Sequence, residues 1–326
     1  MSLYDKPAVS LDEHLSILLQ RGLAIPDEQQ ARHYLANISY YRLSAYTRPF
    51  YLPNQQKHSF LPGTSFADVL HLYIFDRELR LHLLDAIERL EIALRTQLAN
   101  TLGEHHGPHG YLAATVFDSR YRHDWLIEKL ESEARARDVE AFLAHYRNKY
   151  RSAPPQPPIW MAVELLTFKE VSTLFANLRL PQDTQRIQAH FGWPYTLLKS
   201  WFRSLSDLRN LCAHHSRVWN REFGSRPEIP KRPPEYWPVV PEHIATGAHL
   251  HPKQTLSPRR RLYLQLVVIE SLMRRVSPES QWAERLVQLL DRYPQVSRPH
   301  MGFPADWENE SFWSTTVKAA RKEKLS

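Results

Sequence analysis

Residues 66–102 read FADVLHLYIFDRELRLHLLDAIERLEIALRTQLANTL, which is the longest stretch of the chain with one hydrophobic period. Its apolar residues recur at intervals of three and four, the spacing of one face of an α-helix. Thr64 and Ser65 supply an N-cap just before this stretch, and the glycines of residues 103–110 supply an end. We therefore expect one long helix, broken at most once.

The same period extends over most of the chain. It predicts further helices over residues 11–21, 27–38, 124–150, 160–178, 194–218, 258–275 and 281–291. No stretch alternates cleanly between apolar and polar residues over five positions, and only 9 of the 326 residues are glycine, so tight turns that need glycine are scarce. The sequence thus predicts an all-α fold.

Two proline-rich segments divide the chain. Residues 153–158 read APPQPP and cannot be helix interior, because proline lacks the amide hydrogen. A second such segment covers residues 227–241. We expect one compact unit made of a helical part, a semi-rigid connector, a motif-bearing helical part, and the second proline-rich segment with C-terminal helices, over residues 1–152, 153–158, 159–222 and 223–326.

Composition limits the cellular setting. The formal net charge of +7 favours a polyanionic partner, although a generally solvated surface explains it equally well. Cys212 is the one cysteine, which excludes an internal disulfide and is typical of a reducing compartment. Residues 1–8 lack the apolar core of a signal peptide, and the longest apolar run, 262–269, is too short to cross a bilayer. We expect a cytoplasmic protein that does not contact the membrane.

The expected helix over residues 194–218 carries chemistry on one side. Its apolar stripe consists of Leu198, Trp201, Phe202, Leu205, Leu208 and Cys212. The opposite side consists of Arg203, Asp207, Asn210 and His214. Asn210 and His214 are one turn apart and can act on one ligand. Arg209 projects about 140° from His214 at the edge of the apolar stripe, where a guanidinium is costly unless it meets an anion or an acceptor.

The spacing Arg-x-x-x-x-His alone is not specific, since Arg77 and His82 match it as well. Its context is more specific. Residues 208–215 read LRNLCAHH, followed by Arg217, Trp219 and Asn220, and three stretches upstream, 38–46, 72–80 and 87–95, read ISYYRLSAY, LYIFDRELR and IERLEIALR. Together they resemble the Abi family of abortive-infection proteins (the AbiD/AbiF-like group), within the HEPN superfamily. The resemblance covers residues 15–222, and MGFP at 301–304 is similar to the family's tail.

This resemblance implies a HEPN-type helical bundle with additional N-terminal and C-terminal helices. It also implies a homodimer with a composite site, phage defence by growth arrest, and cleavage of single-stranded RNA without metal or cofactor. Arg209 and His214 match the motif and Asn210 its polar position, while Arg77 and His82 lie outside the signature region.

A chemical mechanism follows as a hypothesis. RNA carries its own nucleophile, the 2′-hydroxyl, so the enzyme needs a base, an acid and charge stabilisation. We expect His214 to move the proton, Arg209 to hold the phosphate, and Asn210 to orient either the phosphate or the imidazole. The products would carry 2′,3′-cyclic phosphate ends.

Further residues are candidates for supporting roles. The possible supporting residues of the site are Glu88, Glu91, Arg95 and His215, although an ion-pair ladder and a packing role explain them too. The candidate RNA-binding residues are Tyr40, Tyr41, Arg42, Arg203 and Arg217, although core packing explains paired tyrosines as well.

Two alternatives remain. The histidines of residues 104–109 (EHHGPH) suit a metal, but the glycine and proline among them favour a loop, and we expect no metal site. A non-catalytic module that binds RNA or protein in a defence or toxin–antitoxin system fits the same resemblance as the nuclease does. The partners expected are an RNA substrate and, for regulation, a small RNA or an antitoxin protein.

Overall fold

The computed structural model describes residues 7–53, 58–136, 139–150, 154–244 and 257–322. These residues form thirteen α-helices and several 3₁₀ turns, with isolated β-bridges in place of any strand. The expected all-α fold is confirmed. No helix within the described ranges combines the length and the apolar character that crossing a membrane requires.

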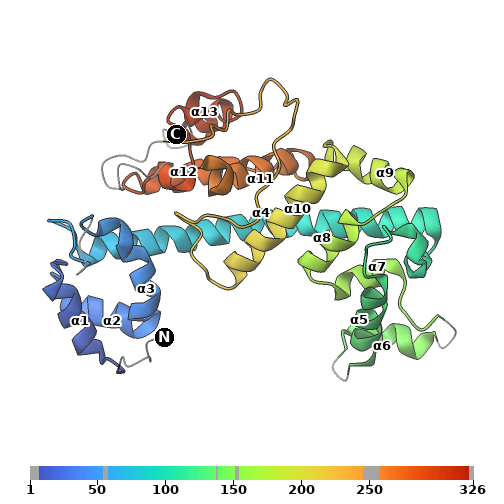
Figure 1. The fold of residues 1–326 in the computed structure, drawn as a ribbon, viewed down its shortest axis with the longest axis horizontal. Coiled ribbons are helices and arrows are strands. Elements are labelled where there is room, and N and C mark those ends of the chain that lie inside the picture. The colour runs from blue at the N-terminus through green and yellow to red at the C-terminus, as the bar shows by residue number, and fades with distance from the viewer. Residues whose placement is uncertain (1–6, 54–57, 137–138, 151–153, 245–256, 323–326) are drawn as a thin grey trace.

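One helix organises the molecule. Helix α4 spans Phe66–His106, 41 residues, and runs along the long axis in Figure 1. Ser65 begins it with a capping box to Asp68, as a polar N-cap should. The expected long helix is confirmed: it is unbroken, and it ends within residues 103–110, where the glycines indicated an end. Gly103 continues the helix, and a Cβ atom at this position would contact the side chains of Ile159 and Trp160. The helix stops at Gly107, whose φ of 77° favours glycine.

Three short helices gather at one end of α4 (Figure 1). They are α1 (Leu11–Gln20), α2 (Glu28–Ile38) and α3 (Tyr40–Thr47). Ser10, Asp27 and Ser39 cap them through their side chains. The first two helices were expected, whereas α3 begins directly after Ser39, whose φ of 67° turns the chain.

The opposite end of α4 departs more from the sequence expectation. The helices there are α5 (His123–Arg135), α6 (Ala141–Lys149), α7 (Ile159–Ala162), α8 (Phe168–Ala176) and α9 (Pro181–Phe191). The single helix expected over 124–150 is therefore wrong, as is the one over 160–178, where a 3₁₀ turn and the capping box of Thr167 intervene. Helix α9 was not expected, because its sequence is mostly polar. Of the proline-rich connector, Ala153 lies outside the described residues, and 154–158 is not helical, with Pro157 and Pro158 buried.

Helix α10 (Tyr195–Ala213) crosses α4 (Figure 1), and its apolar stripe is buried as expected. It ends at Ala213, five residues before the expected end at Val218. Helix α11 (Leu262–Val276) lies beside α4 and is buried from Leu262 to Met273. Helix α12 (Trp282–Arg292) packs against both α4 and α13 (Ser314–Lys322). A helix was expected over 258–275, and the structure begins it four residues later, after a 3₁₀ turn at Pro258–Arg260. Arginines lie at both ends of this core helix.

Candidate functional site

A buried carboxylate fixes the chain after α10. Asp76, on α4, has no exposed surface and accepts hydrogen bonds from the amides of Val218 (3.0 Å) and Trp219 (2.7 Å). The hydroxyl of Tyr46 also donates to it at 2.7 Å, and Arg80 pairs with it. Burial raises the pKa of Asp76, while Arg80 and the Trp219 amide oppose that rise. Because the two amides point to Asp76, they are not available to a continuing helix, and α10 ends early.

Two arginines tie the same segment to α3. Arg42 donates from Nη1 to the carbonyl oxygen of His215 at 2.8 Å, and Arg217 donates from Nη1 to that of Ala45 at 2.9 Å. His215 itself has a positive φ of 56°, which marks the turn out of the helix. Segments 38–46 and 72–80 thus hold the loop that follows Ala213.

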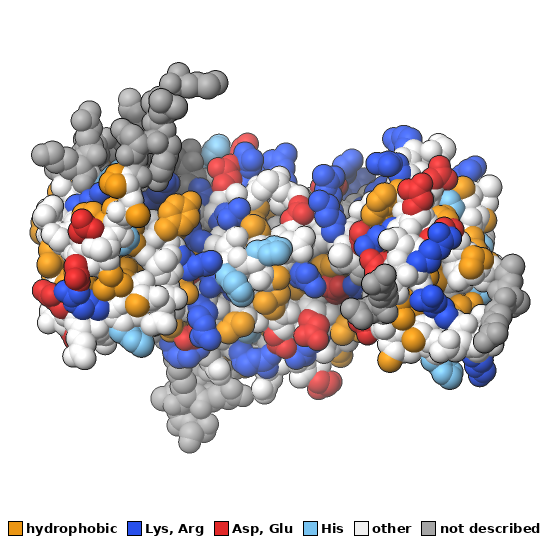
Figure 2. All heavy atoms as spheres, turned by 90° about the horizontal axis from the view of Figure 1, so that it is seen from below, with side chains coloured by type: hydrophobic (Ala, Val, Ile, Leu, Met, Phe, Trp, Pro, Cys, Tyr) orange, Lys and Arg blue, Asp and Glu red, His pale blue; other side chains and the backbone are white. Residues whose placement is uncertain are grey.

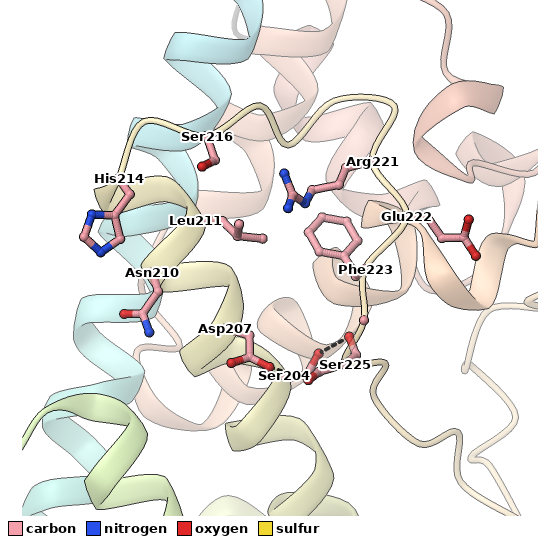
Figure 3. Close-up of a pocket in the computed structure, with 11 residues that line it drawn as sticks. Ser204, Asp207, Asn210, Leu211, His214, Ser216, Arg221, Glu222, Phe223 and Ser225 are labelled. Carbon is pink, nitrogen blue, oxygen red and sulfur yellow. Dashed lines mark hydrogen bonds between the residues drawn. The ribbon is translucent and has the colours of Figure 1, made fainter. Parts of the chain in front are cut away.

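An open pocket of about 410 Å³ lies at this turn (Figure 3). Asn210 and His214 form one side, and the irregular segment from Arg221 to Ser225 forms the other. Ser225 donates a hydrogen bond to Asp207 across the floor. His214 is exposed and caps the end of α10. The pocket therefore presents an accessible imidazole and an amide on a fixed backbone.

Arg209 lies outside the residues that line this pocket. Its Nε is 3.7 Å from Oε2 of Glu91, and its side chain is 40 % exposed. Glu91 also pairs with Arg95, which donates to the carbonyl oxygen of Leu166 at 2.8 Å. Segment 87–95 thereby positions the guanidinium of Arg209 without sealing it from solvent.

The other expected site residues are of two kinds, exposed side chains and one that packs against a neighbour. Glu88 is exposed and joins none of these contacts, and Arg203 is exposed on α10. Tyr40 stacks on His14 with ring centroids 4.3 Å apart, which is a packing role, whereas Tyr41 is 88 % exposed.

The pocket also contains residues that the sequence did not single out, namely Ser204, Leu211, Ser216, Arg221, Glu222, Phe223, Gly224 and Ser225. No spacing signal marks them, since they come from the irregular chain after α10 and from its inward face. On the face shown in Figure 2, a band of Lys and Arg side chains lies beside exposed histidines near the middle of the molecule.

A second polar cluster lies at the far end of α4. Nδ1 of His105 and Nε2 of His106 are 2.6 and 2.9 Å from the two oxygens of the fully buried Asp183. Both histidines belong to the last turn of α4, so the loop expected over 104–109 is wrong in its first half. These three donor atoms lie within 4.8 Å of one another, which makes this the group among the described residues that could hold a divalent cation.

Fold and site together define an all-α protein in which four separated sequence segments meet around one helix end. A family model described as Abi-like protein matches residues 33–220, more than half of the chain, and this chain belongs to that family. All four segments lie within the match, so the expected Abi membership is confirmed. It points to a role in abortive infection, that is, phage defence. Neither the curated proteins nor the solved structures contain a significant match.

Proposed function

We propose that this protein is a metal-independent endoribonuclease of HEPN type that acts in abortive infection, with Arg209, Asn210 and His214 as its catalytic residues. The observation that carries the proposal is the fixed end of α10. A buried carboxylate and two arginine anchors hold a backbone turn that presents the exposed imidazole of His214 beside a pocket. Such rigid support is what a proton-transfer group requires.

The reaction needs only groups that the chain supplies. The imidazole of His214 removes the proton of the 2′-hydroxyl, whose oxygen attacks the adjacent phosphorus. The bond from phosphorus to the 5′ oxygen breaks, and an imidazolium returns a proton to that oxygen. The guanidinium of Arg209 neutralises the non-bridging oxygens as charge builds on them. The products are a 2′,3′-cyclic phosphate and a 5′-hydroxyl.

The position of Arg209 beside the pocket, outside its lining, favours a composite site. In one chain, Asn210 and His214 line the pocket, whereas Arg209 lies between Glu91 and Asn210, with its Nη1 3.5 Å from Oδ1 of Asn210. We propose that two chains pair so that the guanidinium of one copy serves the pocket of the other, and that one imidazole acts as base and its mate as acid.

Cleavage assays in EDTA test the proposal. Wild type should cut labelled RNA in EDTA and leave 2′,3′-cyclic phosphate ends. His214→Ala and Arg209→Ala should lose cleavage, by about 100-fold or more for the histidine. His145→Ala, an exposed histidine on α6, is the matched control and should cut as wild type does. Cleavage that appears only after magnesium is added would refute this mechanism. Growth arrest that persists in His214→Ala would favour the binding module instead.

A further inference from the structure

Four arginines surround the segment that follows α10, in addition to the catalytic residues. Arg217 and Arg221 belong to the segment itself, Arg48 comes from the turn after α3, and Arg261 precedes α11. Arg221 donates to the carbonyl oxygen of Arg217 at 3.3 Å, and Arg261 donates to Oδ1 of Asn220 at 2.9 Å. Three separate parts of the chain therefore bring cations to one place.

These four arginines form no direct ion pair within the described structure. Among the residues that the structure describes, none of the four forms an ion pair with a carboxylate, whereas Arg260 beside them pairs with Glu222 at 2.8 Å. Arg80, Arg95 and Arg321 show the usual pattern elsewhere, each held by one or two carboxylates. Clustered like charges repel one another unless an anion lies between them.

Two of these arginines, Arg217 and Arg261, are partly buried, which makes their positive charge harder to stabilise. Burial lowers the pKa of Arg217, and the nearby Arg48 and Arg221 add to that effect, although Asp76 and Tyr46 oppose it. Burial likewise lowers the pKa of Arg261, although the nearby Glu222 opposes that shift, and its Nε is buried without a hydrogen-bond partner in the described structure. A bound anion that also accepts hydrogen bonds would therefore stabilise the cluster, and phosphate oxygens do both.

The cluster is continuous with the pocket. Arg221 and Ser216 line the same cavity as His214, and Figure 3 shows the guanidinium of Arg221 on the wall opposite that imidazole. Arg48 is exposed and extends the cluster onto the surface. The cations therefore reach beyond the space that one phosphate would occupy.

We infer that Arg48, Arg221 and Arg261 form a backbone-binding subsite that holds the phosphates flanking the scissile bond of a single-stranded RNA. The inference rests on the proposed function for its ligand, but it assigns residues that the nuclease motif does not contain. Contacts of this kind are independent of base sequence, because they engage only phosphates.

Binding assays test the subsite apart from cleavage. The protein used is the full chain carrying His214→Ala, which leaves the RNA intact, and the probe is a fluorescently labelled 12-nucleotide RNA titrated at several salt concentrations. Adding Arg48→Ala or Arg221→Ala should weaken binding and lower the slope of log affinity against log salt by about 0.7 for each lost phosphate contact. A DNA strand of the same sequence should lose affinity in parallel.

The matched control is Arg147→Ala on α6, an exposed arginine that has no ion pair within the described structure. It should change neither the affinity nor the slope, and thermal melting should show that all variants fold. Unchanged binding in both Arg48→Ala and Arg221→Ala would overturn the subsite. So would a polyglutamate peptide that displaces the RNA at equal charge concentration, since the site would then favour acidic protein.

The two proposals fail in different ways. If affinity depends on these arginines but wild type cuts no RNA, the subsite stands and the ribonuclease proposal falls. The opposite outcome is that wild type cuts RNA in EDTA, that Arg48→Ala and Arg221→Ala leave binding by the His214→Ala protein unchanged, and that they leave cleavage by the otherwise wild-type chain unchanged. In that case the subsite falls and the ribonuclease proposal stands.

Discussion

Two places in the molecule have the same spacing, Arg-x-x-x-x-His, but the two pairs differ in how far they are exposed to solvent. Arg77 and His82 lie in the middle of α4, where an uninterrupted helix sends them to different sides. Arg77 is exposed, whereas the ring of His82 stacks on Trp282 with centroids 4.9 Å apart. At the end of α10, Arg209 and His214 both remain accessible to solvent.

The difference lies in what surrounds each pair. Around His82 the neighbours are core residues, and burial together with Arg285 lowers the pKa of its imidazole to about 4. Around His214 the neighbours are backbone anchors and an open pocket. Spacing along a helix therefore does not distinguish a structural histidine from a candidate catalytic one. In this protein, the position of the histidine relative to the end of its helix separates the two.

The largest expected effect separates the two histidines by activity. His214→Ala should lower the rate of RNA cleavage by about 10²- to 10⁴-fold, because it removes a proton-transfer group. His82→Ala should leave that rate near the wild-type value at a temperature where the variant is folded. Single-turnover cleavage of labelled RNA, with circular dichroism to verify folding, measures both. Equal losses of cleavage rate in the two folded variants would contradict the assignment of His82 as structural and His214 as catalytic.

The next effect concerns the support that only the α10 site has. Asp76→Ala leaves Arg80 and two backbone amides buried without their acceptor, which should cost about 3–5 kcal/mol in the free energy of unfolding. Asp85→Ala, which breaks partly exposed ion pairs on the same helix, should cost less than about 1 kcal/mol. Urea unfolding compares them. A cost for Asp76→Ala as small as that of the control would contradict the role assigned to this carboxylate.

A smaller effect, in pH dependence, reports on His82 alone. Its pKa is about 4 in the folded chain and near 6.5 when unfolded, so the unfolded chain binds more protons between these values. The stability from the neutral imidazole is full above pH 6.5 and is lost as the pH falls toward 4, by up to about 3 kcal/mol. His82→Phe should abolish this part of the acid destabilisation, whereas His145→Phe should not. Urea unfolding at pH 7 and pH 4.5 measures the difference.

The smallest effect concerns the thiol on the inner face of α10. Burial raises the pKa of Cys212 to about 12, so the thiol stays neutral near pH 8 and should not react with Ellman's reagent in the folded protein. Full reaction in guanidinium chloride is the control. Rapid reaction under native conditions would show that the apolar side of α10 opens readily.

Much of the fold was predictable because local signals dominate it. The period of α4, the cap at Ser65 and the buried stripe of α10 all follow from residues close in sequence. The end of α10 could not be predicted in this way, since it depends on Asp76, which lies 142 positions before its partner Val218. The residue types Arg209, Asn210 and His214 were identified from their motif, but the pocket wall from Arg221 to Ser225 has no local pattern and needed the folded chain.

In the proposed mechanism, a ribose hydroxyl attacks a phosphodiester held at the end of α10, without metal. The most direct test maps the cleavage site on an RNA in EDTA and then replaces the single 2′-hydroxyl at that site with a 2′-O-methyl group. We expect cleavage at that position to disappear while binding is retained. Cleavage that continues at the same bond would contradict the account, because the nucleophile would then have to come from elsewhere.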